Sequence, residues 1–294
     1  MEILGPVFVA GITTGALYAL ATIGLSLVWG ALGMLNMAHG ALLTIGGYAA
    51  FTLATLLGAP WPVAVLAPVV VGALIGAAIY LLVAQPLLAR APKSFETNVI
   101  IATFGVAIAL ENAVLLIFGG QPFGQSIALP GHLQAGGTFI PWQNVLIVAV
   151  VMVLMAGTAF FLARTRAGRA IRATAQHREA AQLLGVPVGR VYLQVLALSG
   201  GIAGTCGLLV SSITQLSPTL GADPMLKAFI MCVVAGLGNL PGAIGAAFVL
   251  ALIEAFASYA LGARWGFPLL LAIVILVLIW RPDGLFGRAA VRRL

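Results

Sequence analysis

Long runs of apolar residues dominate the chain, and short polar stretches separate them. A helix that crosses a bilayer needs roughly 20 mostly apolar residues. Runs of this kind cover residues 4–29, 36–58, 62–84, 97–118, 141–163, 191–214, 240–261 and 266–280. The pattern predicts an all-α polytopic membrane protein with about eight long transmembrane helices, organised as one transmembrane domain over residues 1–294.

A ninth apolar segment, 224–238, differs from these runs. It is too short for a straight crossing, carries Lys227, and ends among Gly236, Gly238 and Gly242. Irregular backbone is tolerated at membrane depth where protein covers it or where it lines a cavity. We therefore expect a broken or re-entrant helix in this segment.

The composition supports a membrane location. Hydrophobic residues make up 62% of the chain and charged residues 7%, whereas soluble proteins carry roughly 25% charged residues. So few polar side chains cannot cover a water-facing surface, which excludes soluble enzymes, secreted disulfide scaffolds and disordered tails. The net charge of +7 does not indicate nucleic-acid binding, because the basic residues sit at junctions between apolar runs.

The distribution of basic residues predicts the orientation. Segments 85–96, 164–190 and 281–294 hold 12 of the 14 lysines and arginines, whereas the loop 119–140 has none. Lys and Arg are enriched in cytoplasmic loops. We therefore expect these three segments on the cytoplasmic side of a bacterial inner membrane, with a periplasmic N-terminus and a cytoplasmic C-terminus. Segment 224–238 must then cross in some broken form.

Glycines four residues apart recur in the apolar runs. Such pairs let neighbouring helices approach closely and predict tight packing. The pairs are Gly11 with Gly15, Gly72 with Gly76, Gly200 with Gly204, and Gly238 with Gly242.

Several polar residues fall inside the predicted spans, where ionisable groups are functional candidates. Glu111, beside Asn112, and Glu254 can either face a solute path or form hydrogen bonds between helices or subunits. His39 follows Asn36 in an irregular stretch. There we favour a structural role, in which Asn36 caps a helix and His39 ties the loop down.

No residue pattern indicates catalysis, a metal site or a resident cofactor. The three histidines lie in different surroundings, and the signatures of zinc proteases and serine hydrolases do not occur. A GxxxxGK motif followed by Ser or Thr is missing as well, so the chain cannot be its own P-loop ATPase. Cys206 and Cys232 lie in apolar stretches and are expected to be packed thiols.

The segment Arg164–Arg190 is the one long hydrophilic stretch. From Ala170 to Leu184 it is rich in Ala and lacks Gly and Pro, which predicts one helix ended by Gly185 and Pro187. This helix can lie at the membrane surface with its arginines on lipid phosphates. It can equally be a docking helix for a cytoplasmic partner, and sequence physics alone does not decide between the two.

Motifs along almost the whole chain resemble a known family, the permease subunits of branched-chain amino acid ABC importers of the hydrophobic amino acid uptake type. The order and spacing of the motifs carry the resemblance. They are Tyr18–Gly30 (YALATIGLSLVWG), Leu35–Gly40 (LNMAHG) with Gly46–Tyr48, Ala102–Gly105 (ATFG) with Phe118–Gly119, Arg172–Gly185 (RATAQHREAAQLLG), Gly236–Gly242 (GLGNLPG) and Arg281–Gly287 (RPDGLFG).

The resemblance implies partners and an ATPase-coupling loop at 164–190. A permease of this family works with a second related permease or a second copy, two P-loop ATPases that bind the ATP, a periplasmic solute-binding protein and membrane lipid. Glu179-Ala180-Ala181 followed by Gly185 matches the start of the loop motif that contacts the ATPases. The expected coupling residues are Gly168, Arg169, Arg172, Glu179, Ala180, Ala181 and Gly185; the expected path residues are Asn36, His39, Gly40, Glu111, Asn112, Asn239 and Glu254.

Two other functions compete with this one. An ion-coupled secondary carrier would use Glu111 or Glu254 and would need no ATPase. An intramembrane enzyme or lipid-handling protein is the other alternative, and the absence of a nucleophile–base set in this sequence weighs against it. Within the family, the solute can be Leu, Ile or Val, but also urea, short amides or aromatic acids.

Overall fold

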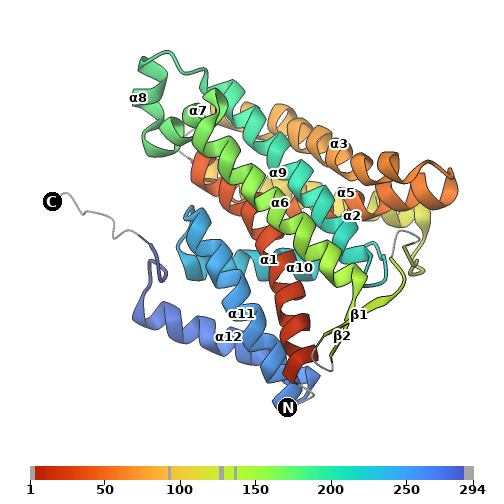
Figure 1. Cartoon of the computed structure of the whole chain (residues 1–294). Helices are drawn as coiled ribbons and strands as arrows, with labels where there is room; N and C mark the ends of the chain where they lie inside the picture. The colour runs from red at the N-terminus through yellow and green to blue at the C-terminus, as the bar shows by residue number, and fades with distance from the viewer. Residues whose placement is uncertain (1–3, 92–93, 126–128, 136–137, 288–294) are drawn as a thin grey trace.

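A computed structural model describes residues 4–91, 94–125, 129–135 and 138–287 of the chain, and it is a helical bundle (Figure 1). Eight of its helical segments are long and apolar enough to cross a membrane, which confirms the predicted all-α architecture. The helices are α1 (Leu4–Leu32), α2 (His39–Phe51), α3 (Trp61–Ile79), α4 (Gln85–Arg90), α5 (Phe95–Phe118), α6 (Trp142–Arg164), α7 (Arg166–Gln176), α8 (Arg178–Leu183), α9 (Val188–Ser211), α10 (Ala222–Ala235), α11 (Leu240–Leu261) and α12 (Ala263–Trp280).

The described residues also form two π-helical turns and one hairpin. The turn η1 (Thr52–Leu56) extends α2, and η2 (Tyr80–Ala84) joins α3 to α4. The third span therefore continues to Arg90, beyond its expected end at residue 84. Pro86 follows this π turn in the first turn of α4, where the missing N–H of a proline is tolerated. Strands β1 (His132–Ala135) and β2 (Thr138–Pro141) pair antiparallel.

The predicted close approaches hold for three of the four glycine pairs. A methyl group added at Gly72 would meet the carbonyl oxygen of Gly200, so α3 and α9 touch backbone to backbone. Gly11 and Gly15 bring α1 against Leu252 and Phe248 of α11. Such contacts replace the hydrophobic effect as the source of helix association in lipid. The fourth pair does not pack two helices, because Gly238 lies in the loop after α10 with φ +85°.

Helix α10 is the broken element that segment 224–238 predicts. It has 14 residues, too few to cross a bilayer. Its start is packed deep in the bundle, where a methyl group at Gly221 would meet the carbonyl oxygen of Gly40. From there it follows α1: Lys227 contacts Tyr18, and Cys232 donates to the Thr22 carbonyl oxygen. The helix therefore covers only about half the depth of the bundle.

The two ends of the bundle carry different structures. Helices α7 and α8 project at the end where α6 finishes, and the start of α1 and the β1–β2 hairpin lie at the opposite end (Figure 1). Helices α1 and α9 form the centre, since most of their residues are buried against α2, α3, α10 and α11.

Candidate functional site

The hydrophilic stretch forms two helices instead of the single helix expected over Ala170–Leu184. The break falls at His177, which takes an extended backbone conformation, φ −156° and ψ 99°. Its ring Nδ1 accepts a hydrogen bond of 3.4 Å from the Ala180 N–H, so His177 caps the start of α8. The Ala-rich composition favours helix everywhere in this stretch, and the local cap overrides it at one position.

Helix α7 turns directly away from the end of α6. Thr165 connects them and its Oγ1 accepts from the Gly168 N–H at 2.9 Å, a side-chain cap of α7. A methyl group at Gly168 would collide with the carbonyl oxygens of Phe161 and Leu162. Gly168 is therefore required by the turn, and it is buried instead of offered to a partner.

Two arginines of α7 bind back to the chain. Arg169 Nη1 donates to the Arg164 carbonyl oxygen at 3.4 Å, and Arg172 Nη2 donates to the Ala163 carbonyl oxygen at 3.3 Å. Both therefore satisfy carbonyls at the C-terminal end of α6, where cations are favoured. Because α7 is held in this way, a force on α7 acts on α6.

The end of α8 and the residue that follows it present two exposed leucines. Leu183 is 89% exposed and Leu184 is 85% exposed, with Glu179 and Ala180 exposed beside them. We call these four residues the docking tip. Ala181 points inward and is 3% exposed, and Gly185 ends the segment with φ +82°. The expected coupling residues thus divide into an exposed set and a set that shapes the turn.

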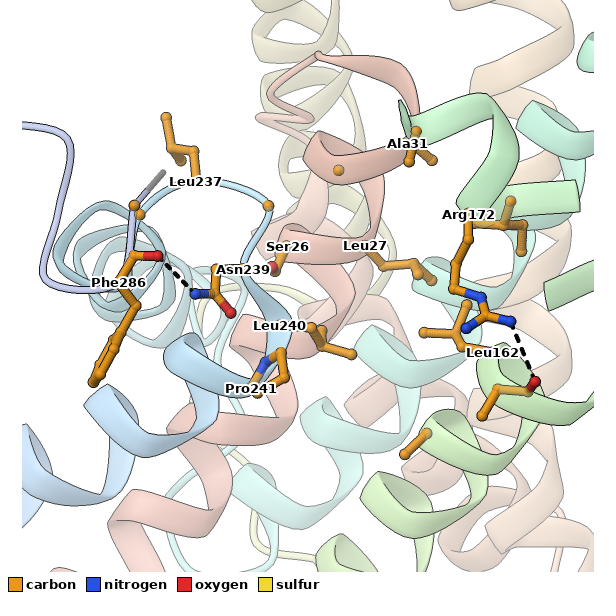
Figure 2. A pocket seen from close by; sticks show the side chains of 18 residues that line it. Ser26, Leu27, Ala31, Leu162, Arg172, Leu237, Asn239, Leu240, Pro241 and Phe286 are labelled. Carbon is orange, nitrogen blue, oxygen red and sulfur yellow. Dashed lines mark hydrogen bonds between the residues drawn. The ribbon is translucent and has the colours of Figure 1, made fainter. Parts of the chain in front are cut away.

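A cavity of about 680 Å³ lies between α7 and the loop that joins α10 to α11 (Figure 2). Arg172 lines it on one side and Asn239 on the other. Asn239 Oδ1 accepts from the Gly242 N–H at 3.1 Å, and its Nδ2 donates to the Phe286 carbonyl oxygen at 3.0 Å. Asn239 therefore caps α11 and fastens the segment after α12 to it.

A second cavity, of about 640 Å³, shares Gly30, Arg172 and Gly238 with the first and extends to Arg178. The guanidinium carbon of Arg178 lies 5.6 Å from the ring centre of Tyr192 on α9. The two cavities together separate α7 and the start of α8 from the loop that follows α10.

The expected path residues at the start of α2 are packed in the core. His39 is fully buried, and its Nε2 lies 3.1 Å from the Ala21 carbonyl oxygen. Asn36 Oδ1 accepts from the Ala38 N–H at 3.1 Å, and the Gly40 N–H points at Met225 Sδ of α10. The contacts of His39 and Gly40 join α2 to α1 and α10. The expectation that Asn36 caps this helix is wrong, because the N-cap of α2 is Ala38, which has no side-chain cap; Asn36 instead holds the turn before the helix.

The two intramembrane glutamates have different surroundings. Glu111 is half-buried on α5, and the neighbouring Asn112 is exposed, with its Nδ2 donating to the Ile108 carbonyl oxygen of the same helix at 2.8 Å. Glu254 of α11 instead pairs with Lys227 of α10 at 2.8 Å. The glutamate of α11 thus belongs to an ion pair within the chain.

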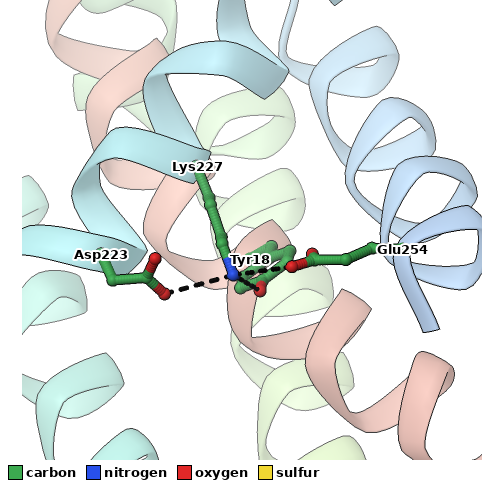
Figure 3. A network of polar contacts seen from close by, with 4 residues as sticks. All are labelled: Tyr18, Asp223, Lys227 and Glu254. Atoms are coloured by element: carbon green, nitrogen blue, oxygen red, sulfur yellow. Dashed lines mark hydrogen bonds and ion pairs between the residues drawn. The ribbon is translucent and has the colours of Figure 1, made fainter. Parts of the chain in front are cut away.

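Lys227 is the centre of a polar cluster from three helices (Figure 3). Its Nζ donates to the Tyr18 hydroxyl at 2.5 Å and to Glu254 Oε1 at 2.8 Å, and it lies 3.2 Å from Asp223 Oδ2. Sequence reasoning singled out Lys227 and Glu254 but missed Tyr18 and Asp223. The sequence did contain one signal for Asp223: it precedes Lys227 by four residues, and residues four apart are neighbours on a helix.

Comparison with known proteins gives a consistent result over nearly the full length. Residues 7–279 match the family model described as branched-chain amino acid transport system, permease component. The chain is 31% identical to the high-affinity branched-chain amino acid transport system permease protein BraD of Pseudomonas aeruginosa, over 97% of this chain and 96% of that protein. It is 30% identical to the permease protein LivH of Escherichia coli, over 96% and 95%. A probable branched-chain amino acid transport permease protein of Methanocaldococcus jannaschii is 28% identical, over 92% and 89%.

Proposed function

Because this chain belongs to the family of permease components of branched-chain amino acid transport systems, we propose that it forms the membrane path of an ATP-driven importer. Its solutes are branched-chain amino acids or close relatives, delivered by a periplasmic binding protein. The path is completed by a second related permease or a second copy. The N-terminus lies in the periplasm and the C-terminus in the cytoplasm of a bacterial inner membrane.

The proposal assigns the energy source to separate subunits. Two P-loop ATPases bind and hydrolyse the ATP, and this chain, a single transmembrane domain, holds no cofactor and catalyses no reaction of its own. The observation that carries this assignment is the docking tip. Leu183 and Leu184 are almost fully exposed at the end of the polar helix pair α7–α8. Two adjacent apolar side chains that would otherwise face water favour a protein partner at this place.

Transmission to the bundle follows from how α7 is held. Its cap at Thr165, the packing of Gly168 on α6 and the bond from Arg172 to Ala163 join α7 firmly to α6. Closure of the ATPases on α8 would therefore tilt α6 and α9. The cavity between α7 and the α10–α11 loop leaves room for that movement.

Solute uptake by proteoliposomes tests the proposal. The reconstituted chain should take up leucine only when the second permease, both ATPases, ATP and the binding protein are present. Uptake that persists without the ATPases and follows a proton or sodium gradient would contradict the proposal and support the ion-coupled carrier.

A further inference from the structure

The polar cluster around Lys227 lies at the middle depth of the bundle. Tyr18, which accepts from Lys227, stands 14 residues from each end of α1. At a rise of 1.5 Å per residue, this is about 21 Å from either end. The charged groups are therefore inside the hydrocarbon region of any bilayer that α1 spans, since that region is about 30 Å thick.

One carboxylate of the cluster is open to the outside of the chain. The Asp223 side chain is 67% exposed, whereas the side chains of Lys227 and Glu254 are 10% and 14% exposed. Ala222 and Leu226, on the same turns of α10, are exposed as well. A carboxylate that faces lipid at this depth costs several kcal/mol. The surface at Asp223 must therefore face water or protein.

The cluster is also short of hydrogen-bond donors. Lys227 has three N–H donors, and they serve Tyr18, Glu254 and Asp223. Two carboxylates and one ammonium leave a surplus of one negative charge. Glu254 Oε2 is buried and has no hydrogen-bond partner among the described residues. A positively charged group that approaches the exposed Asp223 would offset the surplus negative charge of this cluster.

We propose that Asp223 faces the water-filled solute path and supplies a negative contact at mid-depth for an ammonium group of the solute. Lys227 stays fixed by Glu254 and Tyr18, which leaves the exposed Asp223 as the carboxylate that meets the solute. This proposal rests on the importer function and narrows its solute class. Amino acids carry an ammonium group, whereas urea, short amides and aromatic acids do not.

Chemical labelling tests whether Asp223 faces water. In a chain whose Cys206 and Cys232 are replaced by Ala, one variant carries Ala222→Cys and a matched control carries Val153→Cys. Val153 is 70% exposed and stands at the midpoint of α6. Each variant is reconstituted with the second permease, the ATPases and the binding protein, then treated with cationic and anionic methanethiosulfonates.

We expect the thiol of Ala222→Cys to react with both reagents at least tenfold faster than that of Val153→Cys. When Asp223→Asn is added to Ala222→Cys, the rate with the cationic reagent divided by the rate with the anionic reagent should fall by roughly tenfold. This is the effect expected when one unit charge about 6 Å away in water is removed, because the two reagents differ by two charges. Equal rates for the two thiols, or an unchanged ratio in Asp223→Asn, would overturn the proposal. Either result would arise if lipid or the second permease covered this surface.

An uptake measurement links the charge to the solute. Asp223→Asn should raise the KM for leucine uptake at least tenfold, and Asp223→Glu should restore most of the loss. An unchanged KM in Asp223→Asn would contradict a role in meeting the ammonium group. Failure of the importer function itself would appear differently, as uptake by the parent chain that does not depend on the ATPases.

Discussion

Removal of the apolar side chains at the docking tip should weaken the ATPase complex. Leu183 and Leu184 are 89% and 85% exposed in the chain alone, so nearly all the free energy of burying them is released when the ATPase binds. Replacement of Leu by Ala removes three carbons, worth about 0.8 kcal/mol each when fully buried, or at most about 2.4 kcal/mol per residue. Since about 1.4 kcal/mol is a factor of ten, we expect each single variant to raise the Kd for the ATPase about tenfold to fiftyfold.

The assay is ATPase binding to the permease in nanodiscs, measured by biolayer interferometry. Leu183→Ala and Leu184→Ala should leave thermal stability unchanged, because substitutions at exposed sites usually change stability by less than about 0.5 kcal/mol. Leu116→Ala is the matched control, since Leu116 is 86% exposed on α5 away from the tip. If both tip variants bind the ATPase within twofold of the parent, the tip is an interfacial helix end and its docking role is refuted.

Three further expectations concern the tip, the core and the orientation. Ala180→Arg should abolish co-purification of the ATPase while the bundle stays folded, and full ATPase binding by this variant would contradict the docking role. Glu179→Arg should weaken ATPase binding less, because an exposed ion pair is worth about 0–1 kcal/mol. Gly204→Leu should prevent stable folding, measured as loss of a monodisperse peak in detergent, because even a methyl group there would meet the carbonyl oxygen of Pro68. His132→Cys in a cysteine-free chain should react with impermeant reagents from the periplasm, and labelling from the cytoplasm alone would reverse the assigned topology.

The fold was largely predictable because lipid imposes simple rules. Apolar runs of about 20 residues mark the spans, and pairs such as Gly72 with Gly76 mark a close helix approach. The short α10 was predictable as well, since a segment bounded by glycines and carrying Lys227 cannot be an ordinary span. These inferences use only local sequence, and local sequence decides which segments enter the membrane.

The sites were harder to predict, because they depend on contacts between distant segments. The break at His177 arises from one ring nitrogen and is invisible in an Ala-rich stretch that favours helix. Likewise, Tyr18 and Glu254 meet Lys227 only because α1 and α11 both pack against α10. Burial of Ala181 beside the exposed Ala180 also follows from how α8 packs, not from composition.

The ion pair of Lys227 and Glu254 offers a test between the importer and the ion-coupled carrier. Removal of one partner of a buried pair costs about 3–5 kcal/mol, because the other charge is left uncompensated, whereas apolar replacement of both is often neutral. Lys227→Met alone should therefore destabilise the bundle strongly. The double variant Lys227→Met with Glu254→Leu should recover most of the lost stability, measured as thermal aggregation in detergent.

The two functions predict opposite activities for that double variant. An importer takes its energy from ATP, so uptake driven by the ATPases should persist at a third or more of the parent rate in the refolded double variant. A carrier that uses Glu254 for protons or sodium would lose all coupled uptake once the carboxylate is gone. A double variant that is stable again but shows no ATP-dependent uptake would therefore count against the importer. A double variant that is stable and still takes up solute with ATP would leave Glu254 with a structural role, in which it holds Lys227 in place beside α1 and α11.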